Sequence, residues 1–296
     1  MVENSNFRCG FVSIVGKPNV GKSTLMNKIL KEKISIISPK PQTTRHQIKG
    51  ILNDENRQII FLDTPGYLKP RYELQKKMLE YLQNSLKDSD LIIFITDAKT
   101  FPTDYDKELL QLIEQIKLPK LAILNKIDLV DKATEEIKIR QLQQYDFEKV
   151  LSLSVLETVD FGPLIETISA YLPLNPPFYD QETISDLPMR FFVQEIIREQ
   201  IFHIFRQEIP YATTVVVESY KELPNKIEIA ANIWLERKSQ KMIIIGRNGE
   251  MIKKIRENSE KEIHNLVGKR VVLHLWIKIK PNWRKKKNAL KEFGYR

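Results

Sequence analysis

The sequence predicts an α/β domain with a doubly wound, mainly parallel sheet, followed by a smaller α+β domain. Three observations indicate this: short apolar runs alternate with helical segments in the first half, the order changes after a proline-rich segment, and basic charge concentrates in the second half. A length of 296 residues is sufficient for two domains that each bury a core. With 42% hydrophobic and 29% charged residues, the composition is that of a globular protein.

In the first half, apolar runs are each followed by a polar or helical segment. Short strands that alternate with longer helices form parallel sheets, whose ligands bind at the carboxyl ends of the strands. We therefore expect the residues from Gly16, Asp63, Asp97 and Asn125 onward to lie at a ligand site. The strands are expected at 11–16, 58–63, 90–97 and 121–128, and the helices at 22–30, 106–116 and 135–145.

A proline-rich segment without sustained periodicity, at about residues 173–188, indicates the domain junction. The predicted domains are 1–175 and 188–296, joined by a linker at 176–187, and the second domain is expected to end in a basic tail. The second domain has the order α-β-β-α-α-β, which is typical of an α+β fold. Its elements are expected at 189–205, 213–220, 226–236, an apolar segment that ends at Gly246, a helix from about Gly249, and a strand at 269–280.

Charge and cysteine content restrict the class of protein. Residues 180–296 hold 23 Lys and Arg against 15 Asp and Glu, whereas residues 1–179 hold 24 against 23. A focused positive charge favours a polyanion such as nucleic acid or an anionic membrane surface. Cys9 is the only cysteine, which excludes an intrachain disulfide and suits a reducing cytosol. No apolar run is long enough to span a bilayer and no signal pattern begins the chain, so we expect a soluble, non-secreted protein.

Residues 16–23 match the phosphate-binding pattern GxxxxGK[ST], directly after an apolar strand and before a helical run. Gly16 and Gly21 let the backbone wrap around phosphates, and the following helix N-terminus binds the anion. Lys22 is predicted to reach the β- and γ-phosphates, and Ser23 to coordinate Mg²⁺. The alternative is a glycine-rich turn that matches by chance. The predicted set is Gly16, Lys17, Pro18, Asn19, Val20, Gly21, Lys22, Ser23 and Thr24.

A second phosphate element follows the apolar run 59–62. The Asp63 carboxylate is predicted to hold the metal through its water shell, and the amide of Gly66 to meet the γ-phosphate, with Thr64 and Pro65 between them. The alternative is a simple turn at the end of a strand.

The segment 41–45 is too polar for a core and lies between the two phosphate elements. Thr44, with Thr43 as the second choice, is predicted to complete the Mg²⁺ coordination when GTP is bound and to lose that contact after hydrolysis. The predicted metal ligands are therefore Ser23, Thr44 and Asp63. A solvated loop without a metal role is the alternative for this segment.

The choice of base depends on Asn125, Lys126 and Asp128, which follow another apolar strand. A carboxylate accepts two hydrogen bonds from neighbouring N–H donors. Guanine offers N1–H and a 2-amino group in that arrangement and adenine does not, so Asp128 favours guanine. A P-loop ATPase or small-molecule kinase is the rival interpretation, and Asp128 stands against it.

A GxxG turn between two helical segments is the main motif of the second half. Such a turn clamps the backbone of about four nucleotides in KH domains. The basic segment 281–287 combines an aromatic residue with four cations, which suits base stacking and phosphate contact or, alternatively, anionic lipid. The predicted RNA-binding residues are Ile245, Gly246, Arg247, Asn248, Gly249, Lys253, Arg256, Trp283, Arg284, Lys285, Lys286 and Lys287.

Taken together, the motifs GKPNVGKST, QTTR, DTPG, NKID and IIIGRNGEMIKKI resemble those of the bacterial Era family, over nearly the whole chain. The resemblance implies an α/β P-loop GTPase domain followed by an α+β type II KH domain. It also implies GTP and GDP binding, contact with 16S ribosomal RNA near its 3′ end, and a role in small-subunit maturation. We expect a monomer in the cytoplasm with peripheral contact with the inner face of the membrane.

The fifth nucleotide-binding loop is assigned only by resemblance, and an ordinary loop at the end of a strand is the alternative. Ser154, Val155 and Leu156 resemble the fifth nucleotide-binding loop, although Val155 replaces the usual alanine. Tyr67 replaces the glutamine that orients the attacking water in many GTPases, so we expect slow basal hydrolysis. Asn19 occupies the position that ligates potassium in related cation-dependent GTPases. The alternative is that it braces the loop, and both interpretations remain open.

Two hypotheses about function remain to be distinguished. In the first, GTP orders the loop around Thr44 and the turn after Gly66, and so changes the RNA access of the KH domain. In the second, the protein is a signalling or membrane-remodelling GTPase whose basic C-terminal domain binds anionic lipid or a protein.

Overall fold

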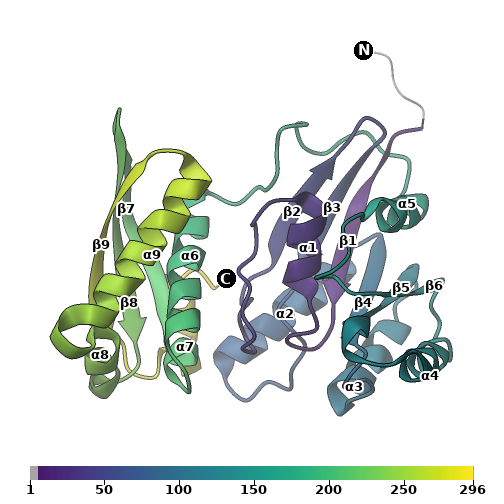
Figure 1. Cartoon of the computed structure of the whole chain (residues 1–296), viewed down its shortest axis with the longest axis horizontal. Helices are drawn as coiled ribbons and strands as arrows, with labels where there is room; N and C mark the ends of the chain where they lie inside the picture. Colours follow the sequence, from purple (N-terminus) through teal and green to yellow (C-terminus); the bar gives the residue numbers. More distant parts are fainter. Residues whose placement is uncertain (1–5, 296) are drawn as a thin grey trace. The chain divides into compact units, whose positions relative to one another are not determined.

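The computed structural model describes residues 6–295, which form two compact units (Figure 1). The first unit extends to Pro70 and includes Met78–Asp186. The second contains Arg71–Lys77 and the chain from Leu187 onward. Within residues 6–295, no helix is long and apolar enough to cross a membrane.

A six-stranded, mainly parallel sheet forms the centre of the first unit. Its strands are β1 (Arg8–Val15), β2 (Ile48–Asn53), β3 (Arg57–Asp63), β4 (Leu91–Asp97), β5 (Lys120–Asn125) and β6 (Lys149–Leu153). The order is β2-β3-β1-β4-β5-β6, and every pair is parallel except β2 with β3. The predicted doubly wound sheet is confirmed. The antiparallel edge strand β2 and the half-buried strand β6 were not predicted.

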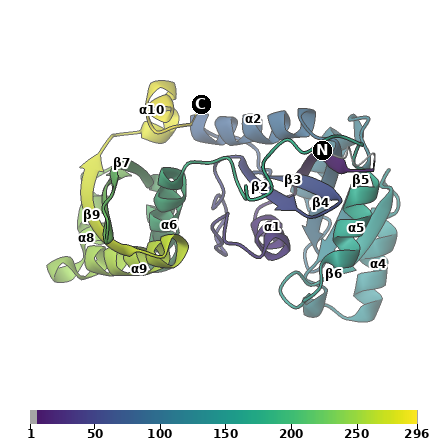
Figure 2. The same ribbon diagram turned by 90° about the horizontal axis from the view of Figure 1, so that it is seen from above.

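Helices cover both faces of this sheet. They are α1 (Lys22–Leu30), α2 (Glu73–Lys87), α3 (Asp104–Glu114), α4 (Lys132–Leu142) and α5 (Gly162–Ala170), with a 3₁₀ turn η1 (Ile127–Leu129). Figure 2 shows α1 and α2 on opposite sides of the sheet. On one face, Leu82, Leu109 and Leu142 pack against Phe94 and Leu124 in a buried core. Because both faces are covered, β4 is buried along its whole length.

The segment predicted as a linker is held by the first unit as far as Asp186. Gln58 Oε1 accepts hydrogen bonds from the amides of Phe178 (2.7 Å) and Tyr179 (3.0 Å). The amide of Ile51 in β2 donates to the carbonyl of Ile184 at 2.8 Å. This part of the chain therefore covers the edge of the sheet.

The second unit has the predicted order α-β-β-α-α-β, with two short helices and two 3₁₀ turns in addition. Its strands are β7 (Thr214–Glu222), β8 (Lys226–Leu235) and β9 (Arg270–Ile279). Its main helices are α6 (Met189–Ile204), α8 (Lys238–Ile245) and α9 (Glu250–Val267). The additions are α7 (Ile209–Ala212) and α10 (Lys287–Glu292), with 3₁₀ turns η2 (Arg247–Gly249) and η3 (Trp283–Lys285).

The three strands form one sheet in the order β7-β8-β9, with β8 antiparallel to β7 and parallel to β9. Helices α6 and α9 lie side by side against the sheet (Figures 1 and 2). Their apolar side chains, such as Ile197, Ile255 and Ile263, pack against Ile229 and Leu273. Alternation along β9 places odd-numbered residues from Val271 to Ile277 in or against this core, and leaves even-numbered positions on the other face.

The prediction of a basic tail at the C-terminal end is wrong. Beyond Pro281 the chain forms η3 and α10, and Trp283, Leu290, Phe293 and Tyr295 are buried. The aromatic ring of Trp283 stacks on Tyr295 and meets Phe293 edge-on. These apolar residues make the segment part of the folded unit, because they bury area that a solvated tail would expose.

Candidate functional site: the nucleotide pocket and the GxxG turn

The phosphate-binding loop connects the carboxyl end of β1 to the N-terminus of α1. Gly21 has φ 107°, and a Cβ there would lie 2.3 Å from Asn125 Nδ2. A Cβ on Gly16 would lie 2.2 Å from the carbonyl oxygen of Ile95. Both glycines are therefore required by close contacts, and at Gly21 also by the left-handed backbone.

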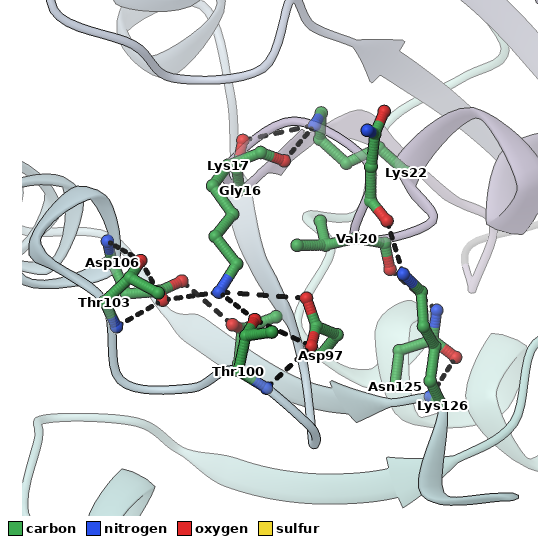
Figure 3. Close-up of polar contacts among 12 residues, drawn as sticks. Gly16, Lys17, Val20, Lys22, Asp97, Thr100, Thr103, Asp106, Asn125 and Lys126 are labelled. Atoms are coloured by element: carbon green, nitrogen blue, oxygen red, sulfur yellow. Dashed lines mark hydrogen bonds and ion pairs between the residues drawn. The ribbon is translucent and has the colours of Figure 1, made fainter. Parts of the chain in front are cut away.

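Lys22 is buried beneath this loop, with 6% of its surface exposed. Its Nζ donates to the carbonyl oxygens of Lys17 (2.9 Å) and Gly16 (3.1 Å) (Figure 3). Burial lowers the pKa of Lys22 to about 8, an effect that nearby Asp63 opposes. An anionic phosphate at this position favours the charged form of the lysine.

The three predicted metal ligands lie together. Ser23 Oγ donates to Asp63 Oδ2 at 2.7 Å and lies 2.9 Å from Thr44 Oγ1. Asp63 Oδ2 also accepts a hydrogen bond from Ser35 Oγ at 2.8 Å, a contact that the sequence did not predict. Thr43 Oγ1 instead donates to the carbonyl of Lys40 at 2.6 Å, so the structure favours Thr44 over Thr43.

Asp63 is fully buried, and burial raises its pKa in spite of hydrogen bonds from Ser23, Ser35 and Thr44. Within the described chain its Oδ1 makes no hydrogen bond. A buried oxygen without a donor costs free energy unless a cation or water meets it. This carboxylate with two hydroxyls is the oxygen-rich ligand set that Mg²⁺ prefers, so the residues present fit the ion.

The turn after Asp63 packs directly on the phosphate loop. Thr64 Oγ1 donates to the carbonyl of Ile14 at 2.8 Å, and the amide of Tyr67 donates to the carbonyl of Gly16 at 3.0 Å. A Cβ on Gly66 would lie 2.7 Å from the backbone nitrogen of Pro18. Gly66 is required because only a residue without a side chain allows this approach.

The side chain of Tyr67 points to α3. Its hydroxyl lies 3.1 Å from Glu108 Oε2, and its ring meets Tyr105 edge-on. Burial and this carboxylate raise the pKa of Tyr67 to about 12. The hydroxyl therefore stays protonated at neutral pH and does not act as a base.

The pocket beside the loop has a volume of about 350 Å³, within the range of small-molecule sites. Asn125 organises it: Nδ2 donates to the carbonyl of Val20 at 2.7 Å, and Oδ1 accepts from the amides of Lys126 (2.7 Å) and Val155 (2.9 Å). Predicted residues that line the pocket are Pro18, Asn19, Gly21, Lys22, Ser23, Thr24, Thr43, Thr44, Gly66, Asn125, Lys126, Asp128, Ser154, Val155 and Leu156.

Other predicted residues support the pocket without lining it. Val20 is fully buried, and Gly16, Lys17, Asp63, Thr64 and Pro65 lie behind the lining. The sequence missed the segment before the threonines, which contributes Ile36, Ile37, Ser38, Pro39 and Gln42. A proline within a polar stretch beside two isoleucines was the available signal for a lining segment.

The GxxG turn connects α8 to α9. Gly246 has φ 73° and Gly249 φ 80°, and Asn248 between them also has positive φ. A Cβ on Gly246 would lie 2.6 Å from Met251 Cγ, whereas one on Gly249 would meet nothing within 4 Å. Open space above Gly249 leaves its backbone accessible to a ligand.

Cations surround this turn and are exposed. Arg247, Lys253 and Arg256 are exposed, as is Asn248, and Ile245 is half-buried. The ion pairs of this group are long: Lys253 and Arg256 each lie 3.8 Å from Glu257. Such exposed ion pairs contribute little to stability. These cations can therefore pair with the phosphates of a polyanion at little cost.

An open depression of about 460 Å³ lies between α9 and β9. It is lined by Ile252, Lys253, Arg256, Leu273, His274, Leu275 and Trp276. Trp276 is 50% exposed, and the centre of its ring lies 6.0 Å from that of His274. Neither residue was predicted from the sequence. The signal was alternation in 270–279, where His274 and Trp276 occupy the exposed phase.

The structure contradicts the prediction that Trp283 binds RNA. It is fully buried, and its Nε1 donates to the carbonyl of Ala212 at 2.9 Å. Because its ring is enclosed, it does not stack on a base. Arg284 forms an ion pair with Glu236, whereas Lys285, Lys286 and Lys287 remain exposed.

Comparison with known proteins matches a separate family model to each of the two units. Residues 11–126 match a family model described as a 50S ribosome-binding GTPase, and residues 208–284 match a KH domain. The chain is 41% identical to GTPase Era of Carboxydothermus hydrogenoformans over 98% of both chains, and 43% identical to GTPase Era of Geotalea daltonii over 98% of both.

Two solved structures are similar over the whole fold. One is a variant of Aquifex aeolicus Era bound to GDP and AlF₄⁻, and the other is Era with MgGDPNP and nucleotides 1506–1542 of 16S ribosomal RNA. Each has a TM-score of 0.94 and 36% identity, and covers 98% of this chain and 99% of the other.

Proposed function

This chain belongs to the Era family of GTPases, and from that premise we propose that it is a slow switch: it binds 16S rRNA through its KH domain and assists assembly of the small ribosomal subunit. The observation that carries the proposal is the exposed, basic GxxG turn in a chain whose other unit holds a complete nucleotide pocket. An Era relative bound to a segment of 16S rRNA supports it.

For the nucleotide, we propose GTP or GDP with Mg²⁺. Ser23, Thr44 and Asp63 would hold the ion, which neutralises phosphate charge when bound. Asp128 is exposed and lines the pocket, which suits hydrogen bonds to guanine. Asp128→Asn is expected to shift preference from guanosine to xanthosine nucleotides. Unchanged preference would contradict the base assignment.

The side chain after Gly66 supports the proposal of slow hydrolysis. Tyr67 has no carboxamide to orient water, and its hydroxyl is directed to Glu108. Potassium beside the phosphates would supply a positive charge in place of the one that an arginine supplies in other GTPases. Asn19 lines the pocket and is the proposed ligand.

For RNA, the GxxG backbone and the depression between α9 and β9 provide complementary contacts. Arg247, Lys253 and Arg256 supply phosphate contacts, and the glycines allow a nucleotide backbone to approach. Trp276 is 50% exposed, so we propose that a base stacks on its ring, and each such contact is worth roughly 1–3 kcal/mol.

The test is RNA binding by the double variant Arg247→Glu, Lys253→Glu, with an RNA of the 3′ end of 16S rRNA. We expect loss of RNA binding with GTP affinity unchanged. Lys261→Glu, an exposed cation about three turns along α9, is the matched control and should bind RNA almost normally. RNA binding that survives the double change would refute the site.

We propose a cytoplasmic monomer with peripheral contact with the inner face of the membrane through Lys285, Lys286 and Lys287, which are exposed. Sedimentation with anionic vesicles tests this contact. Binding to vesicles without binding to RNA would favour the rival, a membrane-associated signalling GTPase.

A further inference from the structure

Lys17 lies in the phosphate loop, but its side chain points away from the nucleotide pocket (Figure 3). It is 7% exposed, and its Nζ lies 2.8 Å from Asp106 Oδ2, 2.8 Å from Thr100 Oγ1 and 3.7 Å from Asp97 Oδ2. The loop is thus attached to the residues at the end of β4 and the beginning of α3.

The two carboxylates that pair with Lys17 are held in place by hydrogen bonds from neighbouring threonines. Asp106 is fully buried; its Oδ1 accepts from Thr96 Oγ1 at 2.8 Å, and its Oδ2 from the amide and hydroxyl of Thr103 at 2.8 and 2.7 Å. Asp97 Oδ1 accepts from the amide and hydroxyl of Thr100. Lys17 supplies positive charge to this rigid cluster, and a buried charge without a partner is costly.

The main chain around Lys17 contacts the groups that face the γ-phosphate. The carbonyls of Gly16 and Lys17 accept from Lys22 Nζ, and Gly66 packs against the backbone nitrogen of Pro18. Lys22 reaches the β- and γ-phosphates in P-loop proteins. The position of residues 16–18 therefore sets where Lys22 and Gly66 lie.

The other half of the loop is held separately. Asn125 Nδ2 donates to the carbonyl of Val20 at 2.7 Å, and Lys126 Nζ to the carbonyl of Asn19 at 2.6 Å. These contacts come from the base-binding side of the pocket. The loop is thus held on its base-binding side by Asn125 and Lys126. On its γ-phosphate side it is held by the contacts of Lys17 with Asp106 and Thr100, together with the hydrogen bond from the amide of Tyr67 to the carbonyl of Gly16.

We propose that Lys17 is a positioning residue for the γ-phosphate, which fixes Lys22 and Gly66 through the backbone of residues 16–18. Removal of its charge releases that half of the loop. Affinity for GTP then falls more than affinity for GDP, because GDP has no γ-phosphate. Hydrolysis at saturating GTP falls as well, because misplacement of a phosphate contact lowers the rate.

The test compares Lys17→Met with the wild type. Met is a flexible, unbranched and uncharged replacement. Affinities for GDP and for a non-hydrolysable GTP analogue are measured, together with kcat and KM. We expect about a tenfold loss of analogue affinity, a loss of kcat of similar size, and GDP affinity within about twofold.

Lys120→Met is the matched control. Lys120 is also buried, with 6% exposed, and lies 3.4 Å from the Asp146 carboxylate, but at the beginning of β5, opposite to the nucleotide end. It should leave the ratio of GTP to GDP affinity unchanged, even where thermal unfolding shows lower stability. A purely structural role for Lys17 predicts the same behaviour for both variants.

Thr100→Val provides a second variant that keeps every charge and removes a hydroxyl that accepts from Lys17 and donates to Asp97. It should shift the same ratio in the same direction by about threefold, because Lys17 loses one of its hydrogen bonds while its ion pairs remain. An unchanged ratio and kcat in folded Lys17→Met overturns the proposal. If that variant does not fold, an unchanged ratio in Thr100→Val overturns it.

Discussion

The nucleotide pocket and the GxxG turn hold their charged side chains in opposite ways. In the pocket, Lys22 and Asp63 are buried and hydrogen-bonded to several partners. At the turn, Arg247 and Lys253 are exposed. A buried charge acts through geometry, so removal of one group affects the whole site. Exposed charges act additively through the potential that they create, and salt screens them.

The same substitution in both regions tests this contrast and has the largest expected effect. Lys22→Met removes the charge-assisted hydrogen bonds that this lysine is expected to make to the β- and γ-phosphates, worth roughly 1.5–3 kcal/mol each, so GTP affinity should fall roughly 10³-fold. Lys253→Met should lower RNA affinity only about three- to fivefold, and the slope of log affinity against log salt by about 1. Titrations at several salt concentrations measure both. Losses of equal size would contradict the contrast.

The two tryptophans of the second unit give the next largest effects, in opposite assays. Trp283→Ala empties a buried position and should lower the free energy of unfolding by about 3–5 kcal/mol. Its folded fraction should bind RNA almost normally. Trp276→Ala should lower RNA affinity by roughly 1–3 kcal/mol, with little change in stability. Denaturant unfolding and RNA titration of both variants are the measurements; an RNA defect confined to Trp283→Ala would reverse the assignment.

These tryptophans also show where sequence reasoning stops. The motifs predicted the nucleotide site because each combines residue type with a strand before it, and parallel strands bring their carboxyl ends to one edge. Trp283 beside four cations was assigned to RNA because composition does not show which face is covered. Phe293 and Tyr295, which enclose it, are 10 and 12 residues further along the chain.

Lys17 shows the same limit within a predicted motif. Its place in the loop was predicted, but the direction of its side chain depends on Asp97 and Asp106, which are about 80 to 90 residues away. Similarly, β2 contains Gly50 and was not predicted, because its place as a strand depends on pairing with β3. Local pattern fixes an element and its chemistry, whereas long-range packing decides what a side chain contacts.

The cation dependence of hydrolysis has a smaller expected effect and concerns the pocket alone. If Asn19 ligates potassium, kcat should be about tenfold higher in potassium than in sodium, which corresponds to roughly 1.4 kcal/mol. Asn19→Ala should remove that difference. Asn19 Nδ2 donates to the carbonyl of Pro39 at 2.6 Å, which supports the alternative of a brace. A brace predicts a loss of nucleotide affinity in both salts and equal rates in potassium and sodium.

The smallest expected effect is the coupling between nucleotide binding and RNA binding. If GTP and RNA favour the same state of the protein, each must raise the affinity of the other by the same factor. With a coupling free energy near the lower end of the usual 1–3 kcal/mol, cognate RNA should increase the preference for GTP over GDP roughly fivefold. Nucleotide competition with and without a saturating 3′-end 16S rRNA segment measures the factor. The double variant Arg247→Glu, Lys253→Glu is the control and should show no increase. An unchanged preference with wild-type protein and bound RNA would mean that the two sites act independently, since a ligand shifts an equilibrium only through differential affinity for its states.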